Sequence, residues 1–170
     1  MMDRLHGDGA LVQFSERLTN STAFGNLFRE GMDLVEETAA YLDGIGRSEA
    51  KTLERAVSLT YATESMRLTT RLMQLASWLL LHRAVKEGEM TLTQANREKT
   101  KVKLSAADPG PSETIEKLPQ QLQELIARSM SLQSRVRRLD TSIHSPPPER
   151  AAIGNPLVPQ LNRLKAAFEQ

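Results

Sequence analysis

The stretch from Ser48 to Glu87 contains neither proline nor glycine, and its apolar residues fall on two separate faces when it is drawn as a helix. The first face comprises Leu53, Val57, Tyr61, Leu68, Leu72, Leu75 and Leu79. The second, nearly opposite, comprises Leu59, Ala62, Met66, Met73 and Leu80. A surface helix needs only one apolar stripe to meet its own core. The second face therefore predicts a contact with another helix of the chain or with a second copy of the protein.

We interpret the second face as the interface of a homodimer, formed by Leu59, Met66, Met73 and Leu80. The methionines suit this role because their flexible thioether chains adapt to irregular contact surfaces. A chain that stayed monomeric would need an internal cover for the same face. Residues 93–104, folding back, are the segment expected to supply that cover.

Apolar residues at helical spacing elsewhere in the chain predict an all-α protein, a three-helix bundle with a long central helix. Helices are expected at about 21–43, 48–87, 93–104 and 118–144. Gly44 and Gly46 are expected to end the first, Ser48 to cap the second, and Gly88 to end it. Residues 105–117 read as a flexible linker and residues 1–20 as a flexible N-terminal segment. Residues 145–170, with five of the eight prolines, read as a disordered tail.

The sequence contains few of the residue patterns that catalysis or metal binding requires. The absence of cysteine excludes disulfides and thiolate metal sites, and the Glu-x-x-His pattern of di-iron bundles does not occur. No glycine-rich phosphate loop or nucleophile elbow is present. We therefore expect no enzyme, no cofactor and no metal. With no signal peptide and no apolar run of about 20 residues, the sequence predicts a cytoplasmic protein without membrane insertion.

Charge is distributed unevenly although the formal net charge is only +1. Residues 1–46 carry eight acidic and three basic residues (−5), while residues 47–104 carry six acidic and eleven basic residues (+5). This asymmetry favours pairing between the first two long helices. Basic runs occur at Arg97, Lys99, Lys101 and Lys103 and at Arg135, Arg137 and Arg138. Because no aromatic residue is interleaved with them, they indicate a solvated helix face rather than nucleic-acid binding.

Two further groups of residues are candidate partner-binding sites. Glu64, Arg67 and Arg71 form a narrow polar strip between the two apolar faces. The strip is either an ion-pair ladder solvated at the edge of the bundle or a recognition strip that presents arginines to an acidic partner. Leu157, Leu161, Leu164 and Phe168 lie at helical spacing near the end of the tail. That segment either orders on a partner's groove or frays or folds onto its own bundle.

The segments LFREGMDLVEETAAYL (residues 27–42) and YATESMRLTTRLMQLASWLLLHRAVKEGEMT (residues 61–91) resemble the alphaproteobacterial regulator of CtrA degradation (RcdA-like) family. The resemblance spans residues 11–104 and, more loosely, 115–144. It implies a dimeric three-helix bundle with a disordered tail. It also implies an adaptor, concentrated at the cell pole, that helps deliver regulatory proteins to the ClpXP protease during the cell cycle together with a response-regulator-like adaptor. The alternatives are a small DNA-associated regulator and a structural homodimer without cargo.

Overall fold

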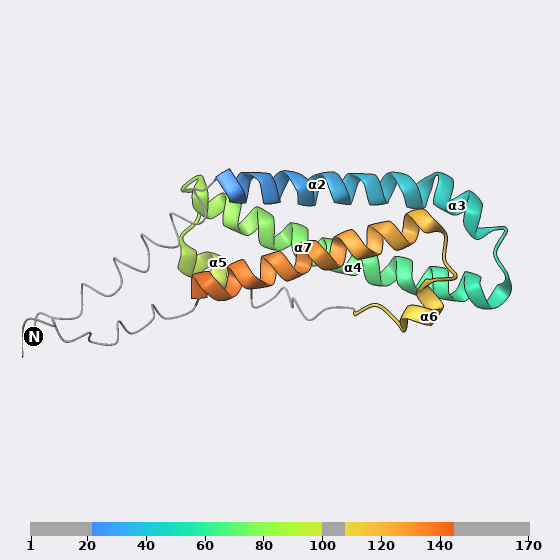
Figure 1. Cartoon of the computed structure of the whole chain (residues 1–170). Coiled ribbons are helices and arrows are strands. Elements are labelled where there is room, and N and C mark those ends of the chain that lie inside the picture. Colours follow the sequence, from blue (N-terminus) through green and yellow to red (C-terminus); the bar gives the residue numbers. More distant parts are fainter. Residues whose placement is uncertain (1–21, 100–107, 145–170) are drawn as a thin grey trace, which may run out of the picture.

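The computed structural model describes residues 22–99 and 108–144, and all regular structure within these ranges is α-helical (Figure 1). The all-α fold predicted from the sequence is confirmed. The helices are α2 (Thr22–Asp43), α3 (Ile45–Ala50), α4 (Arg55–Lys86), α5 (Leu92–Lys99), α6 (Ser112–Ile115) and α7 (Gln120–His144). The described residues do not include the expected N-terminal segment 1–20, residues 100–107 or the tail 145–170.

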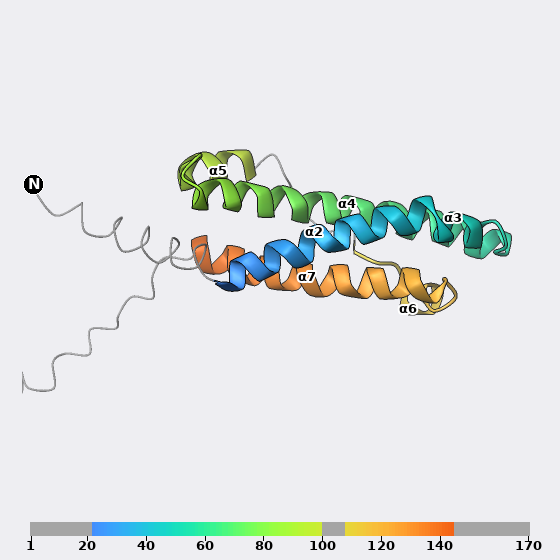
Figure 2. The same ribbon diagram turned by 90° about the horizontal axis from the view of Figure 1, so that it is seen from above.

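The long helices α2, α4 and α7 contact one another pairwise, and α2 lies over the other two (Figures 1 and 2). The first apolar face of α4 enters the core, with Leu68 and Leu79 fully buried. A second apolar stripe, the α7 seam, alternates spacings of four and three residues and comprises Leu118, Leu122, Leu125, Ser129, Leu132, Val136, Leu139 and Ile143. It enters the core as well, because Leu122, Leu132 and Val136 are fully buried. Gly31 of α2 packs against the side chain of Leu79, which leaves no room there for a larger residue.

The long helix expected from residue 48 to residue 87 is two helices, with an interruption at residues 51–54. Ser48 lies inside α3 and caps no helix. At the interruption, Thr52 donates to the carbonyl of Glu49 from both its backbone N–H (3.0 Å) and its hydroxyl (2.8 Å), which closes a turn at the end of α3.

Gly46 does not end the first helix either, since it lies within α3. A Cβ atom at this position would stand 2.7 Å from the ring of Tyr41 and 2.7 Å from the hydroxyl oxygen of Tyr61. The absence of a side chain lets α3 pack closely against these two tyrosines. Tyr41 also donates a hydrogen bond to the carboxylate of Glu49 (2.8 Å), which holds α3 onto α2. Burial and this acceptor raise the pKa of the Tyr41 phenol.

The described part of the segment expected to be a flexible linker, residues 108–117 of 105–117, contains the short helix α6, which packs against α4. We call residues 108–118 the strap, because they connect to α7 along the flank of α4 (Figure 1). The strap ends at the buried Leu118, which joins the core. The backbone N–H of Gly110 donates to the carboxylate of Glu64 (3.0 Å), so a side chain of α4 fixes the strap.

The acidic residues of α2 pair with α7 rather than with α4. Glu37 contacts Arg128 at 2.7 Å, and Glu30 forms a two-pronged ion pair with Arg135. α2 also packs against α4, but these two ion pairs of α2 go to α7, and the central arginines of α4 have other partners. Arg67 bonds Glu64 and Arg71 bonds Ser129 of α7.

Candidate interaction surfaces

The second apolar face of α4 is open to solvent in the single chain. Leu59, Met66, Met73 and Leu80 are 71%, 72%, 66% and 53% exposed. Successive members are seven residues apart, so they form one line along the helix, about 32 Å long at 1.5 Å per residue. The expected cover by residues 93–104 is wrong for its described part, since α5 packs on α4 and leaves these four side chains exposed.

Charge is absent from this face over most of its length. Between Ala56 and His82 the only charged residues of α4 are Glu64, Arg67 and Arg71, and none of them lies on the face. Three of the nearby hydroxyls are bonded within the helix, and that of Thr63 donates to the carbonyl of Leu59 (3.0 Å). Thr69 and Ser77 donate to their own preceding turns in the same way, each at 2.8 Å. An exposed apolar patch of this extent is typical of a protein–protein contact.

The polar strip is not at the surface. Glu64 is 2% exposed and Arg71 is 0% exposed, so both the solvated ladder and the recognition strip predicted from the sequence are wrong for these two residues. The strap covers Glu64, and α7 covers Arg71. Only Arg67 remains partly exposed, with its side chain 39% accessible and 2.6 Å from the Glu64 carboxylate.

Arg71 joins α4 to α7 through hydrogen bonds inside the bundle. Its guanidinium donates to the hydroxyl of Ser129 (2.8 Å), which in turn donates to the carbonyl of Ile126 (2.7 Å). Burial lowers the pKa of Arg71, and the nearby carboxylates of Glu64 and Asp108 partly oppose that effect. Ser129, the single small polar residue in the α7 seam, is therefore the acceptor for a buried arginine.

A second polar cluster joins α4, α5 and α7 at the other end of the bundle, around Asp140. Its carboxylate accepts hydrogen bonds from the indole N–H of Trp78 (2.8 Å) and from the ammonium of Lys99 (2.5 Å). His144, one turn along α7, also contacts Asn96 of α5. This cluster was not predicted from the sequence. Its signals were the single tryptophan in an apolar helix, whose N–H needs a buried acceptor, and the four-residue spacing of Asp140 and His144.

His82 lies beneath this cluster, 2% exposed, with its ring centroid 4.1 Å from that of Trp78. Burial lowers the pKa of His82 to about 4, although the Asp140 carboxylate acts in the opposite direction. The imidazole is therefore neutral at neutral pH. The cluster holds α5 against the bundle, because Lys99 and Asn96 of α5 bond Asp140 and His144 of α7.

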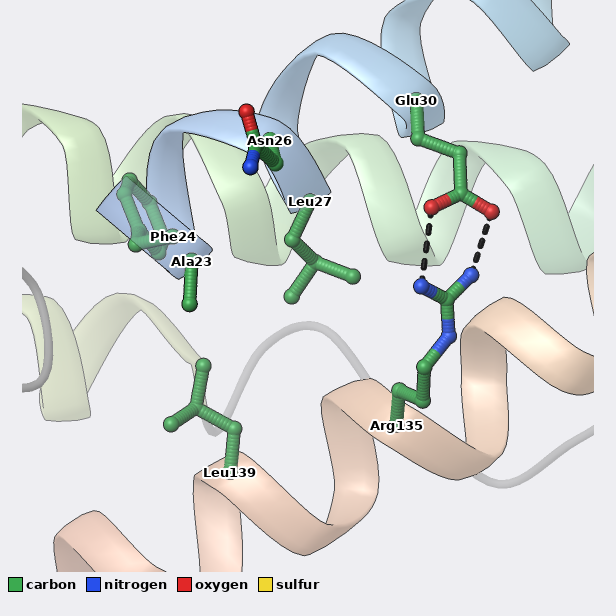
Figure 3. Close-up of a pocket in the computed structure, with 7 residues that line it drawn as sticks. All are labelled: Ala23, Phe24, Asn26, Leu27, Glu30, Arg135 and Leu139. Carbon is green, nitrogen blue, oxygen red and sulfur yellow. Dashed lines mark hydrogen bonds and ion pairs between the residues drawn. The ribbon is translucent and has the colours of Figure 1, made fainter. Parts of the chain in front are cut away.

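A shallow groove of about 390 Å³ lies between α2 and α7 (Figure 3). Its lining comprises Ala23, Phe24, Asn26, Leu27, Glu30, Arg135 and Leu139. The charged groups at one end of the groove bond each other (Figure 3), and this hydrogen bonding lowers the pKa of Glu30 and raises that of Arg135. Both charges are thus satisfied by helix pairing, and the groove presents no free reactive group.

The basic runs are partly neutralised. Lys99 bonds Asp140 and Arg135 bonds Glu30, whereas Lys101 and Lys103 lie outside the described residues. The tail residues Leu157, Leu161, Leu164 and Phe168 lie outside them as well. Within residues 22–99 and 108–144, histidine, aspartate and glutamate side chains form no group of three that could hold a metal ion. No helix in the same ranges has the length and apolarity to cross a bilayer.

Comparisons with known proteins place this arrangement in context. The sequence model of the family described as "Protein of unknown function (DUF1465)" matches residues 15–168. The chain is similar to RcdA from Caulobacter crescentus CB15, known from a crystal structure, with 50% sequence identity and a TM-score of 0.62. The match covers 75% of this chain and 96% of that chain. Among curated proteins, none matches significantly.

Proposed function

Because the chain belongs to the DUF1465 family and is similar to RcdA, we propose that it is a non-enzymatic adaptor in regulated proteolysis that self-associates as a homodimer. In this proposal it helps deliver regulatory proteins to the ClpXP protease during the cell cycle. It works with a response-regulator-like adaptor in the cytoplasm, concentrated at the cell pole. The similarity to RcdA supports the adaptor class, and the exposed apolar face of α4 supports the self-association.

The exposed face of α4 is the observation that carries the proposal. Its four large apolar side chains are spaced symmetrically about the midpoint between Thr69 and Thr70. A two-fold axis through this point would pair two antiparallel copies of α4, with Met66 opposite Met73 and Leu59 opposite Leu80. Such an interface uses one patch on both subunits, as closed dimers require. The short threonines at the crossing point allow the two helices to approach closely.

Burying the face would remove from water four large side chains that the single chain leaves more than half exposed. Full burial of a leucine or methionine side chain contributes about 1.5–3 kcal/mol. The absence of charge matters as much, because an uncharged face carries no like charges to repel each other when two copies meet. The same surface is also suited to an apolar helix of another protein.

The proposal is tested by placing charge on the face. We expect Met66→Glu combined with Met73→Glu to give a helical monomer by light scattering, where the unchanged protein is a dimer at micromolar concentration. In a reconstituted reaction with ClpXP, the response-regulator-like adaptor and a substrate, delivery by the variant should change relative to the unchanged protein. The matched control is Ala127→Glu with Ser134→Glu, which puts two charges seven residues apart on the exposed side of α7.

Two results would contradict the proposal, each in a different part. If the unchanged protein is monomeric at high micromolar concentration, the proposal of a homodimer is wrong. If the chain neither binds the other components nor alters the rate of substrate loss, the proposal of an adaptor role is wrong. The control variant should match the unchanged protein in both assays, which separates an effect of the α4 face from a general effect of added charge.

A further inference from the structure

The exposed methionines of the part of the chain that the structure describes lie on the α4 face. The chain has seven methionines and no cysteine, so thioethers are its only sulfur groups. Met66 and Met73 are 72% and 66% exposed, whereas Met32 and Met130 are partly buried against the core. Susceptibility of a methionine to oxidation follows the access of the oxidant to its sulfur. Of the five methionines in residues 22–99 and 108–144, these two are the most exposed, and they lie at the centre of the surface assigned to self-association.

We propose that Met66 and Met73 are an oxidation site through which hydroperoxides weaken the association of this face. The inference rests on the proposed function, because it needs the α4 face to be an interface. Its chemistry is a two-electron oxidation of the thioether by a hydroperoxide. The O–O bond breaks as an S–O bond forms, the sulfur becomes a sulfoxide, and hydrogen peroxide is reduced to water.

The reaction converts a flexible apolar side chain into a polar one, which disrupts methionine-rich contacts. In the antiparallel pairing, Met66 of each copy faces Met73 of the other, so oxidation would place four sulfoxides around the two-fold axis. The hydroxyl protons of Thr63, Thr69 and Ser77 are used within the helix, which leaves the Thr70 hydroxyl as the threonine donor near the centre of this face. The two Thr70 hydroxyls of a dimer cannot bond all four sulfoxides, so burial would leave polar oxygens without partners.

Association and oxidation also oppose each other by mass action. The exposure that makes the sulfurs reactive belongs to the single chain, and pairing would cover them. Oxidation thus proceeds through the dissociated chain, and the product is a chain less able to pair again. We expect the oxidation rate of Met66 and Met73 to fall as protein concentration rises, while the rates at Met32 and Met130 stay constant.

The test treats the full chain with hydrogen peroxide and follows each methionine by peptide mass spectrometry, with sedimentation of the same samples. We expect sulfoxide first at Met66 and Met73, accompanied by an increase of about tenfold or more in the dimer dissociation constant. Methionine sulfoxide reductases should restore the original value. The variant Met66→Leu with Met73→Leu keeps an apolar face without sulfur, so its dimer should resist the same treatment.

Each outcome decides a separate point. Oxidation of Met32 and Met130 as fast as Met66 and Met73 would overturn the site, as would a dimer that keeps its affinity with both sulfoxides present. Equal peroxide sensitivity of the leucine variant would overturn the assignment to these two sulfurs. An untreated protein that is already monomeric would instead remove the dimer of the proposed function, which the sedimentation of the untreated sample shows independently.

Discussion

Three ionisable side chains of α4, those of Glu64, Arg71 and His82, lie inside the bundle. Each has a different solution to the cost of burial. Glu64 accepts from Gly110 and Arg67, Arg71 donates to Ser129, and His82 stays neutral. Substitutions that remove a partner of one of these buried groups are therefore expected to lower the free energy of unfolding.

The titration of His82 predicts acid sensitivity. Its pKa is about 4 in the folded chain against an ordinary value of 6.5, so below pH 6.5 the unfolded chain binds a proton that the folded chain does not. The contribution of the neutral imidazole is fully present above about pH 6.5 and is lost as pH falls towards 4. We expect a loss of about 2 kcal/mol between pH 7 and pH 5 by urea unfolding. In His82→Phe this part of the pH dependence should vanish, and identical profiles in the two proteins would contradict the assignment.

Arg71→Glu is expected to unfold or strongly destabilise the bundle. The change removes the bond to Ser129 and places a second carboxylate near Glu64, deep between α4 and α7. Breaking a buried charged interaction by removing one partner costs about 3–5 kcal/mol. Arg138→Glu, on the exposed side of α7, should stay within about 0.5 kcal/mol of the unchanged protein. Equal unfolding free energies for the two variants would show that Arg71 is solvated after all.

At the scale of elements, the spacing of apolar residues correctly predicted which faces of α4 and α7 are buried. The stripe containing Leu68 and Leu79 and the seam containing Leu122 and Leu132 both enter the core as their periodicity indicated. The burial of Glu64 was not predictable in this way. It depends on the strap, which is distant in sequence and whose composition reads as a linker. The break before α4 was not predictable either, because residues 51–54 contain neither proline nor glycine.

The strap can be tested by substituting its glycine. A Cβ atom at position 110 would stand 2.9 Å from the Glu64 carboxylate and 3.1 Å from the Arg67 guanidinium, so Gly110→Ala must displace the buried carboxylate or the strap. We expect a loss of about 1–3 kcal/mol in unfolding free energy and faster amide exchange across residues 108–118. Gly25→Ala is the matched control, because a Cβ there meets nothing within 4 Å and alanine favours helix. A strap unaffected by Gly110→Ala would show that the Glu64 bond does not fix it.

For the whole molecule, the core and the proposed contact surface use different sides of the same bundle. All members of the described core lie between Phe24 and Ile143, and the exposed α4 face adds nothing to them. The sequence predicted this two-sidedness because two stripes on one helix are visible without knowledge of the fold. It did not predict which charged residues pair, since the pairing of Glu30 with Arg135 depends on the crossing of α2 and α7.

The same separation predicts that a chain ending at His144 folds normally. The three consecutive prolines Pro146–Pro148 prevent α7 from continuing into the tail, so the melting temperature and helix content should match those of the full chain, within about 0.5 kcal/mol in unfolding free energy. The family match nevertheless continues to residue 168 and includes Leu157, Leu161, Leu164 and Phe168. We expect substrate delivery in the reconstituted reaction to fall for the shortened chain. A full-length variant with these four residues changed to serine should show the same fall, which separates their contacts from the length of the tail. Unfolding of the shortened chain, or delivery equal to that of the full chain, would contradict the assignment of partner binding to these residues.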